Sequence, residues 1–137
     1  MPATVLIVDD EPHMLRIAEL SLKRGGFHLL VGRNGRQAIE LATRHLPDLI
    51  VMDVLMPEVD GLTALRRLKA DPVTADIPVI MITARGHVMT RQEAEEYGAA
   101  LFLTKPFSPT QLLLETRRLI APPSADCPAE PVAAAVS

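Results

Sequence analysis

The sequence predicts an α/β protein in which helices cover both faces of one parallel sheet. Five short apolar runs alternate strictly with segments of helical periodicity along the chain. The run at 49–52 is apolar at every position, which is typical of a strand buried on both faces. Because the 137 residues are 48% hydrophobic but only 3% aromatic, we expect one domain with a sizeable core built from aliphatic side chains.

The first two β-α units lie at the N-terminal end of the chain. The β-branched run 4–8 predicts a strand, and Pro12, a residue suited to the first helical turn, begins the next helix. Apolar residues at i, i+3 and i+7 form one inward stripe on this helix: Leu15, Ala18 and Leu22. After two glycines, residues 27–31 predict the second strand, and residues 37–45 predict the second helix.

The third and fourth strands are expected in the middle of the sheet. Residues 49–52 predict the third strand, and Pro57 with the Asp60–Gly61 pair closes the loop before a helix over 62–70. The fourth strand is predicted at 77–82, after a polar loop that contains a proline. Both strands are continuous apolar runs, so we expect them to be buried on both faces.

The two C-terminal helices differ in the strength of their sequence signals. The segment 85–97 has few apolar positions and several acids, so we expect a loosely held helix there. Residues 99–103 predict the fifth strand. The last helix has a clear start, because Ser108 and Gln111 have capping-box spacing and Pro109 falls at the first helical position.

A change of composition near residue 120 divides the chain. Residues 121–137 contain four prolines and six alanines, with no aromatic residue and no basic charge. We therefore expect one domain over residues 1–120, followed by a Pro/Ala-rich linker or disordered tail over 121–137.

Composition also limits the expected compartment and partners. A formal net charge of −3 gives no reason to expect a nucleic-acid partner. The single cysteine, Cys127, cannot form an internal disulfide and fits a reducing compartment. There is no signal-peptide pattern and no run of the ~18 apolar residues that a membrane span needs. We expect a cytoplasmic protein with no membrane partner.

The predicted topology gathers the polar residues at the strand ends. Five parallel strands fit the flavodoxin-like order 2-1-3-4-5, in which the second strand lies at an edge. The carboxyl ends of the other four strands carry candidate functional residues: Asp9, Asp10, Asp53, Thr83 and Lys105. Because ligands bind at these ends where the strand order reverses, we expect a site between the first and third strands.

The residue types at this site predict phosphoryl-transfer chemistry. A cluster of carboxylate oxygens without His or Cys selects Mg²⁺ or Mn²⁺ over zinc, and a cation would relieve the repulsion between the acids. One carboxylate can then act as the nucleophile while the others bind the metal. An aspartate nucleophile, a divalent cation, a hydroxyl and a lysine are the groups that formation of an acyl phosphate requires.

Four separated motifs occur at the strand ends. They are Asp9-Asp10 after the first strand, Asp53-Val54-Leu55-Met56-Pro57 at the third, Thr83-Ala84 at the fourth and Phe102-Leu103-Thr104-Lys105-Pro106-Phe107 at the fifth. In this order and spacing, over about residues 3–120, they resemble the receiver domain of bacterial two-component response regulators, of the single-domain, chemotaxis-regulator-like kind. The resemblance implies that Asp53 accepts a phosphoryl group from a sensor histidine kinase or phosphotransfer protein. The domain would catalyse only its own phosphorylation and dephosphorylation.

The resemblance also implies roles for individual residues in binding metal and phosphate. Asp9, Asp10 and Asp53 would hold the Mg²⁺ ion, together with the backbone carbonyl of Leu55. Lys105 would bind a phosphoryl oxygen.

By the same resemblance, the site carries a switch. The Lys105–Pro106 peptide bond would be cis. Thr83 would move toward the phosphate, and Phe102 would turn inward behind it. The output would be the surface of the fourth helix, fifth strand and fifth helix, about residues 86–119, which a downstream protein reads.

Three alternatives remain open. We prefer a switch that acts by contact with a protein partner, and a phosphorelay intermediate or the receiver part of a larger regulator is the alternative within the same family. A phosphatase of the haloacid-dehalogenase type also combines Asp, Thr, Lys and Mg²⁺, but it carries its nucleophile after the first strand in an Asp-x-Asp pattern and has a capping insertion. Here the acids after the first strand are adjacent and every loop is short, so this alternative is the least favoured.

Overall fold

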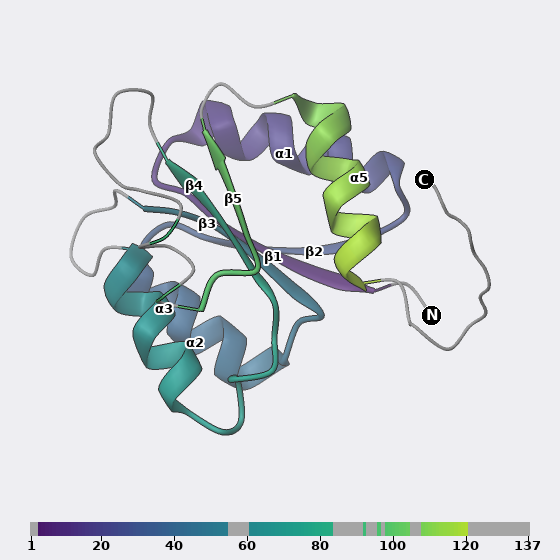
Figure 1. Ribbon diagram of the computed structural model, residues 1–137. Coiled ribbons are helices and arrows are strands. Elements are labelled where there is room, and N and C mark those ends of the chain that lie inside the picture. Colours follow the sequence, from purple (N-terminus) through teal and green to yellow (C-terminus); the bar gives the residue numbers. More distant parts are fainter. Residues whose placement is uncertain are drawn as a thin grey trace.

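Five parallel strands form one sheet at the centre of the protein (Figure 1). In the computed structural model, which describes residues 3–54, 61–83, 92, 96, 98–104 and 108–120, the strand order is β2-β1-β3-β4-β5. The strands are β1 (Thr4–Val8), β2 (His28–Gly32), β3 (Leu49–Asp53), β4 (Val79–Thr83) and β5 (Leu101–Thr104). The predicted fold class and strand order are confirmed.

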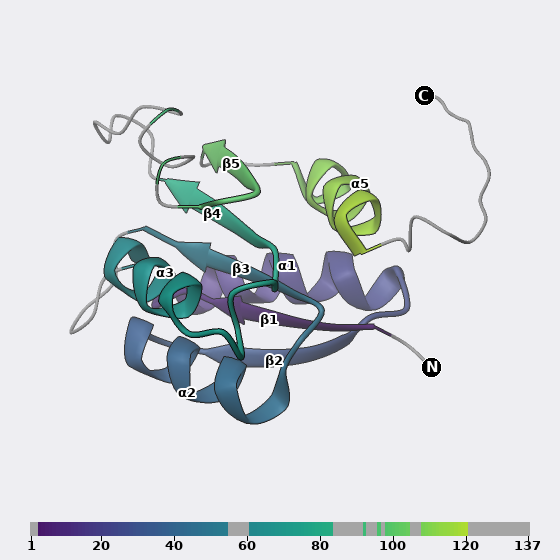
Figure 2. The same cartoon turned by 60° about the horizontal axis from the view of Figure 1, so that its bottom comes forward.

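Helices cover the sheet on both faces (Figures 1 and 2). On one face lie α1 (Pro12–Arg24) and α5 (Pro109–Ile120), and on the other α2 (Gly35–His45) and α3 (Gly61–Ala70). The predicted helix over 85–97 lies outside the described residues except for Gln92 and Glu96, which are helical. The predicted tail, 121–137, also lies outside them. Within the described part of the chain, none of the helices has the length and apolar character to cross a membrane.

The sheet separates two hydrophobic cores. Successive side chains of a strand point to opposite faces, so Val5 and Ile7 of β1 pack with α1 and α5, whereas Leu6 and Val8 pack with α2 and α3. The four apolar residues of β3 divide between the cores in the same way. Full burial of one such side chain contributes about 1.5–3 kcal/mol, which explains why the central strands are apolar except at one terminal residue each.

The register of the central strands fixes the level of the strand ends. Val8 of β1 pairs with Met52 of β3, so the residues that follow them, Asp9 and Asp53, lie side by side. On the other side of β3, Asp53 pairs with Ile82 of β4. The carboxyl ends of β1, β3 and β4 therefore form one continuous edge.

Some element boundaries differ from those predicted, for local reasons. The second helix begins at Gly35 rather than Gln37, because the Asn34 side chain caps it and accepts a hydrogen bond from the Gln37 amide at 2.9 Å. The fourth strand begins at Val79, after Pro78, which has no amide hydrogen to donate to the sheet. The start of α5 is as predicted, and the Ser108 hydroxyl accepts a hydrogen bond from the Gln111 amide at 3.3 Å.

Candidate functional site

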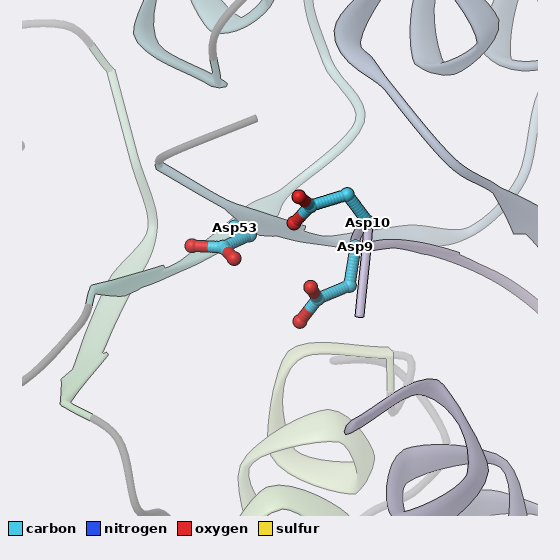
Figure 3. Close-up of side chains that lie close together, drawn as sticks. All are labelled: Asp9, Asp10 and Asp53. Carbon is cyan, nitrogen blue, oxygen red and sulfur yellow. The ribbon is translucent and has the colours of Figure 1, made fainter. Parts of the chain in front are cut away.

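Three carboxylates converge at the carboxyl ends of β1 and β3 (Figure 3). Asp9 and Asp10 follow β1, and Asp53 is the last residue of β3. One carboxylate oxygen from each residue lies within 4.8 Å of those from the other two. The structure thus brings together the three acids that the sequence analysis assigned to one site.

The three acids differ in their surroundings. Asp9 and Asp53 are 5% and 4% exposed, whereas Asp10 is exposed. The Asp9 carboxylate accepts a hydrogen bond from the Glu11 amide at 3.0 Å, and the Asp9 amide donates to the Gly32 carbonyl of β2 at 3.2 Å. These bonds fix Asp9 at the turn between β1 and α1. Asp9 and Asp53 thus form the buried side of the cluster, and Asp10 lies on the side that faces solvent.

The donor set of this cluster fits a small divalent cation. It consists of carboxylate oxygens only, which are ligands that Mg²⁺ and Mn²⁺ prefer. Ligands about 2.1 Å from one octahedral Mg²⁺ ion are roughly 3–4 Å apart, so oxygens within 4.8 Å of one another need only small adjustments. Two of the acids are almost completely buried, and burial of several negative charges together is costly without a cation.

The other predicted site residues are described to different extents. Thr83 ends β4, one position beyond the level of Asp53, and pairs in the sheet with Thr104. Phe102 is a half-buried residue of β5 that pairs with Met81. The remaining three predicted residues lie outside the described part of the chain: Leu55, Lys105 and Pro106. The cis Lys105–Pro106 bond and the Thr83–Phe102 switch remain predictions.

One residue beside the site was interpreted from sequence only as the end of a loop. Gly61 is buried at the start of α3, and its amide donates a hydrogen bond to the Val54 carbonyl at 2.9 Å. The residue after the candidate nucleophile is thereby joined to α3. The Asp60–Gly61 pair in the sequence indicated a turn, but a close approach of two backbone segments leaves no separate sequence signal.

Comparison with curated proteins places the chain among response regulators. The family model of the response regulator receiver domain matches residues 5–117. The chain is 37% identical to the DNA-binding dual master transcriptional regulator RpaA of Synechocystis and 38% identical to the phosphate regulon transcriptional regulatory protein PhoB of Pseudomonas aeruginosa. Each alignment covers 85% of this chain, but only 48% of RpaA and 51% of PhoB. The chain thus spans about half the length of these relatives.

Solved structures show the same fold. The chemotaxis response regulator CheY4 of Vibrio cholerae is 28% identical, with a TM-score of 0.80 over 87% of this chain and 99% of that protein. The receiver domain of a sensor histidine kinase of Pseudomonas aeruginosa, solved with a magnesium ion coordinated in its active site cleft, is 29% identical. Its TM-score is 0.81 over 89% of this chain and the whole of that domain. The family match, the strand order and the clustered acids agree, and the chain belongs to the response regulator receiver domain family.

Proposed function

We propose that this receiver domain is a signalling switch that accepts a phosphoryl group on Asp53 in a reaction that depends on Mg²⁺ or Mn²⁺. The observation that carries the proposal is the convergence of the Asp9, Asp10 and Asp53 carboxylates within 4.8 Å. The magnesium ion in the related kinase receiver domain supports the choice of metal.

The position of Asp53 in the sheet favours it as the nucleophile. Asp53 ends the strand that lies between β1, which supplies the other two acids, and β4, which ends at Thr83. A phosphoryl group on Asp53 would thus have the acids on one side and the predicted partners Thr83 and Lys105 on the other.

The transfer step is a substitution at phosphorus. An Asp53 carboxylate oxygen forms the new P–O bond while the bond from phosphorus to the donor breaks, and the donor leaves with the bonding electron pair. Asp9, Asp10 and Asp53 would hold the Mg²⁺ ion, which would neutralise negative charge on the carboxylates and the transferred group. The expected donor in the cell is the phosphohistidine of a sensor kinase or phosphotransfer protein.

Acyl-phosphate labelling tests this proposal. With acetyl phosphate and Mg²⁺, the intact mass should rise by one phosphoryl group, and Asp53→Asn should abolish the gain. Asp48→Asn is the matched control, because Asp48 lies at the other end of β3, where its carboxylate accepts a hydrogen bond from the Thr4 amide at 2.8 Å. Equal labelling in excess chelator, or labelling of Asp53→Asn, would contradict the proposal.

The output is proposed to be a change in the surface over about residues 86–119, read by a downstream protein. The described part of that surface includes β5 and α5.

We assign the receiver to residues 1–120. A phosphorelay intermediate and the receiver part of a larger regulator remain compatible with the site, and the relative RpaA is named as DNA-binding. The second candidate output is therefore an interaction of the phosphorylated chain with a DNA-binding domain.

A further inference from the structure

The start of α3 lies directly against the backbone of Asp53. A Cβ atom placed on Gly61 would overlap the Asp53 carbonyl oxygen, and it would lie 2.9 Å from Val54 Cα and 3.0 Å from the Asp53 carbonyl carbon. All three atoms belong to the backbone, so no side-chain rotation can make room for the methyl group. Glycine is required here for space.

Backbone conformation does not explain this glycine. Among the described glycines, positive φ angles occur at Gly26 and Gly98, so Gly61 has a φ that other residues adopt. Gly25 provides a contrast, because a Cβ there would meet the side chains of Leu113 and Phe27, which can move. The requirement for glycine at position 61 therefore comes from the nearby backbone of Asp53 and Val54 and not from its own backbone angles.

The same peptide segment is held from the opposite direction by the sheet. The Val54 amide donates to the Ile82 carbonyl of β4 at 2.9 Å, while the Val54 carbonyl accepts from the Gly61 amide at 2.9 Å. The Asp53–Val54 segment is thus fixed between β4 and α3. Asp9 and Asp10 come from β1, so a shift of this segment would move Asp53 relative to both of them.

We propose that Gly61 is a positioning residue for the phosphorylation site. Its missing side chain allows α3 to begin against Asp53 and sets the Asp53 carboxylate at the correct distance from Asp9 and Asp10. The inference rests on the proposed phosphorylation of Asp53. Metal binding and phosphoryl transfer are sensitive to displacements well below 1 Å, so a small shift at this point should matter more for chemistry than for folding.

Gly61→Ala and Gly25→Ala form a matched pair for the test. Both add one methyl group to a glycine with close neighbours, and both should lower stability, but only the first lies beside Asp53. Acetyl phosphate labelling of each full-length variant is measured over a range of Mg²⁺ concentrations. For Gly61→Ala we expect the Mg²⁺ concentration at half-maximal labelling to rise about ten-fold or more. Gly25→Ala should keep the wild-type value.

The Mg²⁺ dependence separates positioning from folding. A purely structural role would reduce the folded fraction and the amount of label without changing the half-saturating Mg²⁺ concentration. If Gly61→Ala is partly unfolded, trimethylamine N-oxide is added to favour the folded state, and labelling is compared with wild type under the same conditions.

The results distinguish the two proposals. If wild-type protein is labelled and Gly61→Ala shows an unchanged Mg²⁺ dependence, only the proposed role of Gly61 is overturned, and the proposed function stands. A variant that stays unfolded in the osmolyte would overturn it equally, because Gly61 would then be a requirement of the fold. Failure of wild-type protein to accept the label would instead overturn the proposed function.

Discussion

At the residue scale, the acids of the site were predictable and their supporting contacts were not. Asp9, Asp10 and Asp53 follow apolar runs, and strand order alone brings such positions together. The atoms of Asp53 and Val54 nearest to Gly61 belong to the backbone, and the Asp60–Gly61 pair in the sequence indicated a turn rather than this close approach. A sequence pattern shows which chemical groups are present, whereas close packing depends on three-dimensional distances.

Removal of one of the three acids should weaken metal binding without lowering the thermal stability of the metal-free protein. Asp10→Asn removes one ligand and one repulsive charge, so Mg²⁺ affinity should fall roughly ten-fold while the melting temperature in chelator is unchanged or higher. Thermal unfolding with and without Mg²⁺ measures both effects. Glu40→Gln, an exposed acid on α2, is the control for a general charge effect. A lower melting temperature for Asp10→Asn in chelator would show that Asp10 acts as a structural cap.

At the element scale, apolar runs predicted the strands well because each central strand places side chains in the hydrophobic cores on both faces of the sheet. Helix starts were less predictable where a side chain outside the periodic pattern caps the helix, as Asn34 does for α2. The hydrogen bonds of the Lys69 side chain also could not be predicted from the sequence pattern. Its ammonium donates to the carbonyls of Ala75 and Ile77 at 2.9 and 2.7 Å, which holds α3 to the loop before β4.

Lys69 should make stability rise at alkaline pH. Burial lowers the pKa of Lys69 below its ordinary value of 10.5, against the opposing effect of Asp76. The unfolded chain therefore binds the proton more tightly than the folded protein, and stability rises with pH between the lowered pKa and 10.5. Lys69→Met should lose this rise, measured by urea unfolding from about pH 7 upward. Lys23→Met, an exposed lysine on α1, should keep it, and an equal rise in Lys69→Met would exclude this cause.

A buried hydroxyl on α5 should cost stability. Thr116 is completely buried, and its hydroxyl has no hydrogen-bond partner among the residues that the structure describes. Because an unsatisfied buried polar group costs about 1–3 kcal/mol, Thr116→Val should raise the free energy of unfolding by about 1 kcal/mol. Thr110→Val, at an exposed position in the same helix, controls for helix propensity and should have little effect. A loss of stability in Thr116→Val would mean that the hydroxyl has a favourable interaction.

At the scale of the whole molecule, the sheet connects the acidic cluster to the proposed output surface. Asp53, Ile82 and Leu103 lie across three neighbouring strands, so a change at β3 has a short path to β5. The fold class and strand order could be predicted from alternating elements, because connection rules allow few arrangements. The conformational switch is predicted from the family resemblance alone, since the order of helices and strands does not show two states of one surface.

The proposed switch should depend on Thr83. A swing from 1:99 to 99:1 requires about 5.5 kcal/mol, and two charge-assisted hydrogen bonds from Thr83 and Lys105 to the phosphate would supply roughly 1.5–3 kcal/mol each. Thr83→Ala should therefore keep phosphorylation of Asp53 but lose most of the resulting change in hydrogen exchange over residues 84–104. Thr104→Ala, at the paired position on β5, is the control. An unchanged response in Thr83→Ala would show that the signal leaves the site by another route.

The most direct test of the central claim identifies the phosphorylated residue chemically. Borohydride reduces an aspartyl phosphate to homoserine, so peptide mass spectrometry after labelling with acetyl phosphate locates the modified position. We expect homoserine at residue 53 when Mg²⁺ is present and none in excess chelator. Modification at Asp9 or Asp10 instead, or at Asp53 without a divalent cation, would contradict a metal-dependent phosphorylation site centred on Asp53.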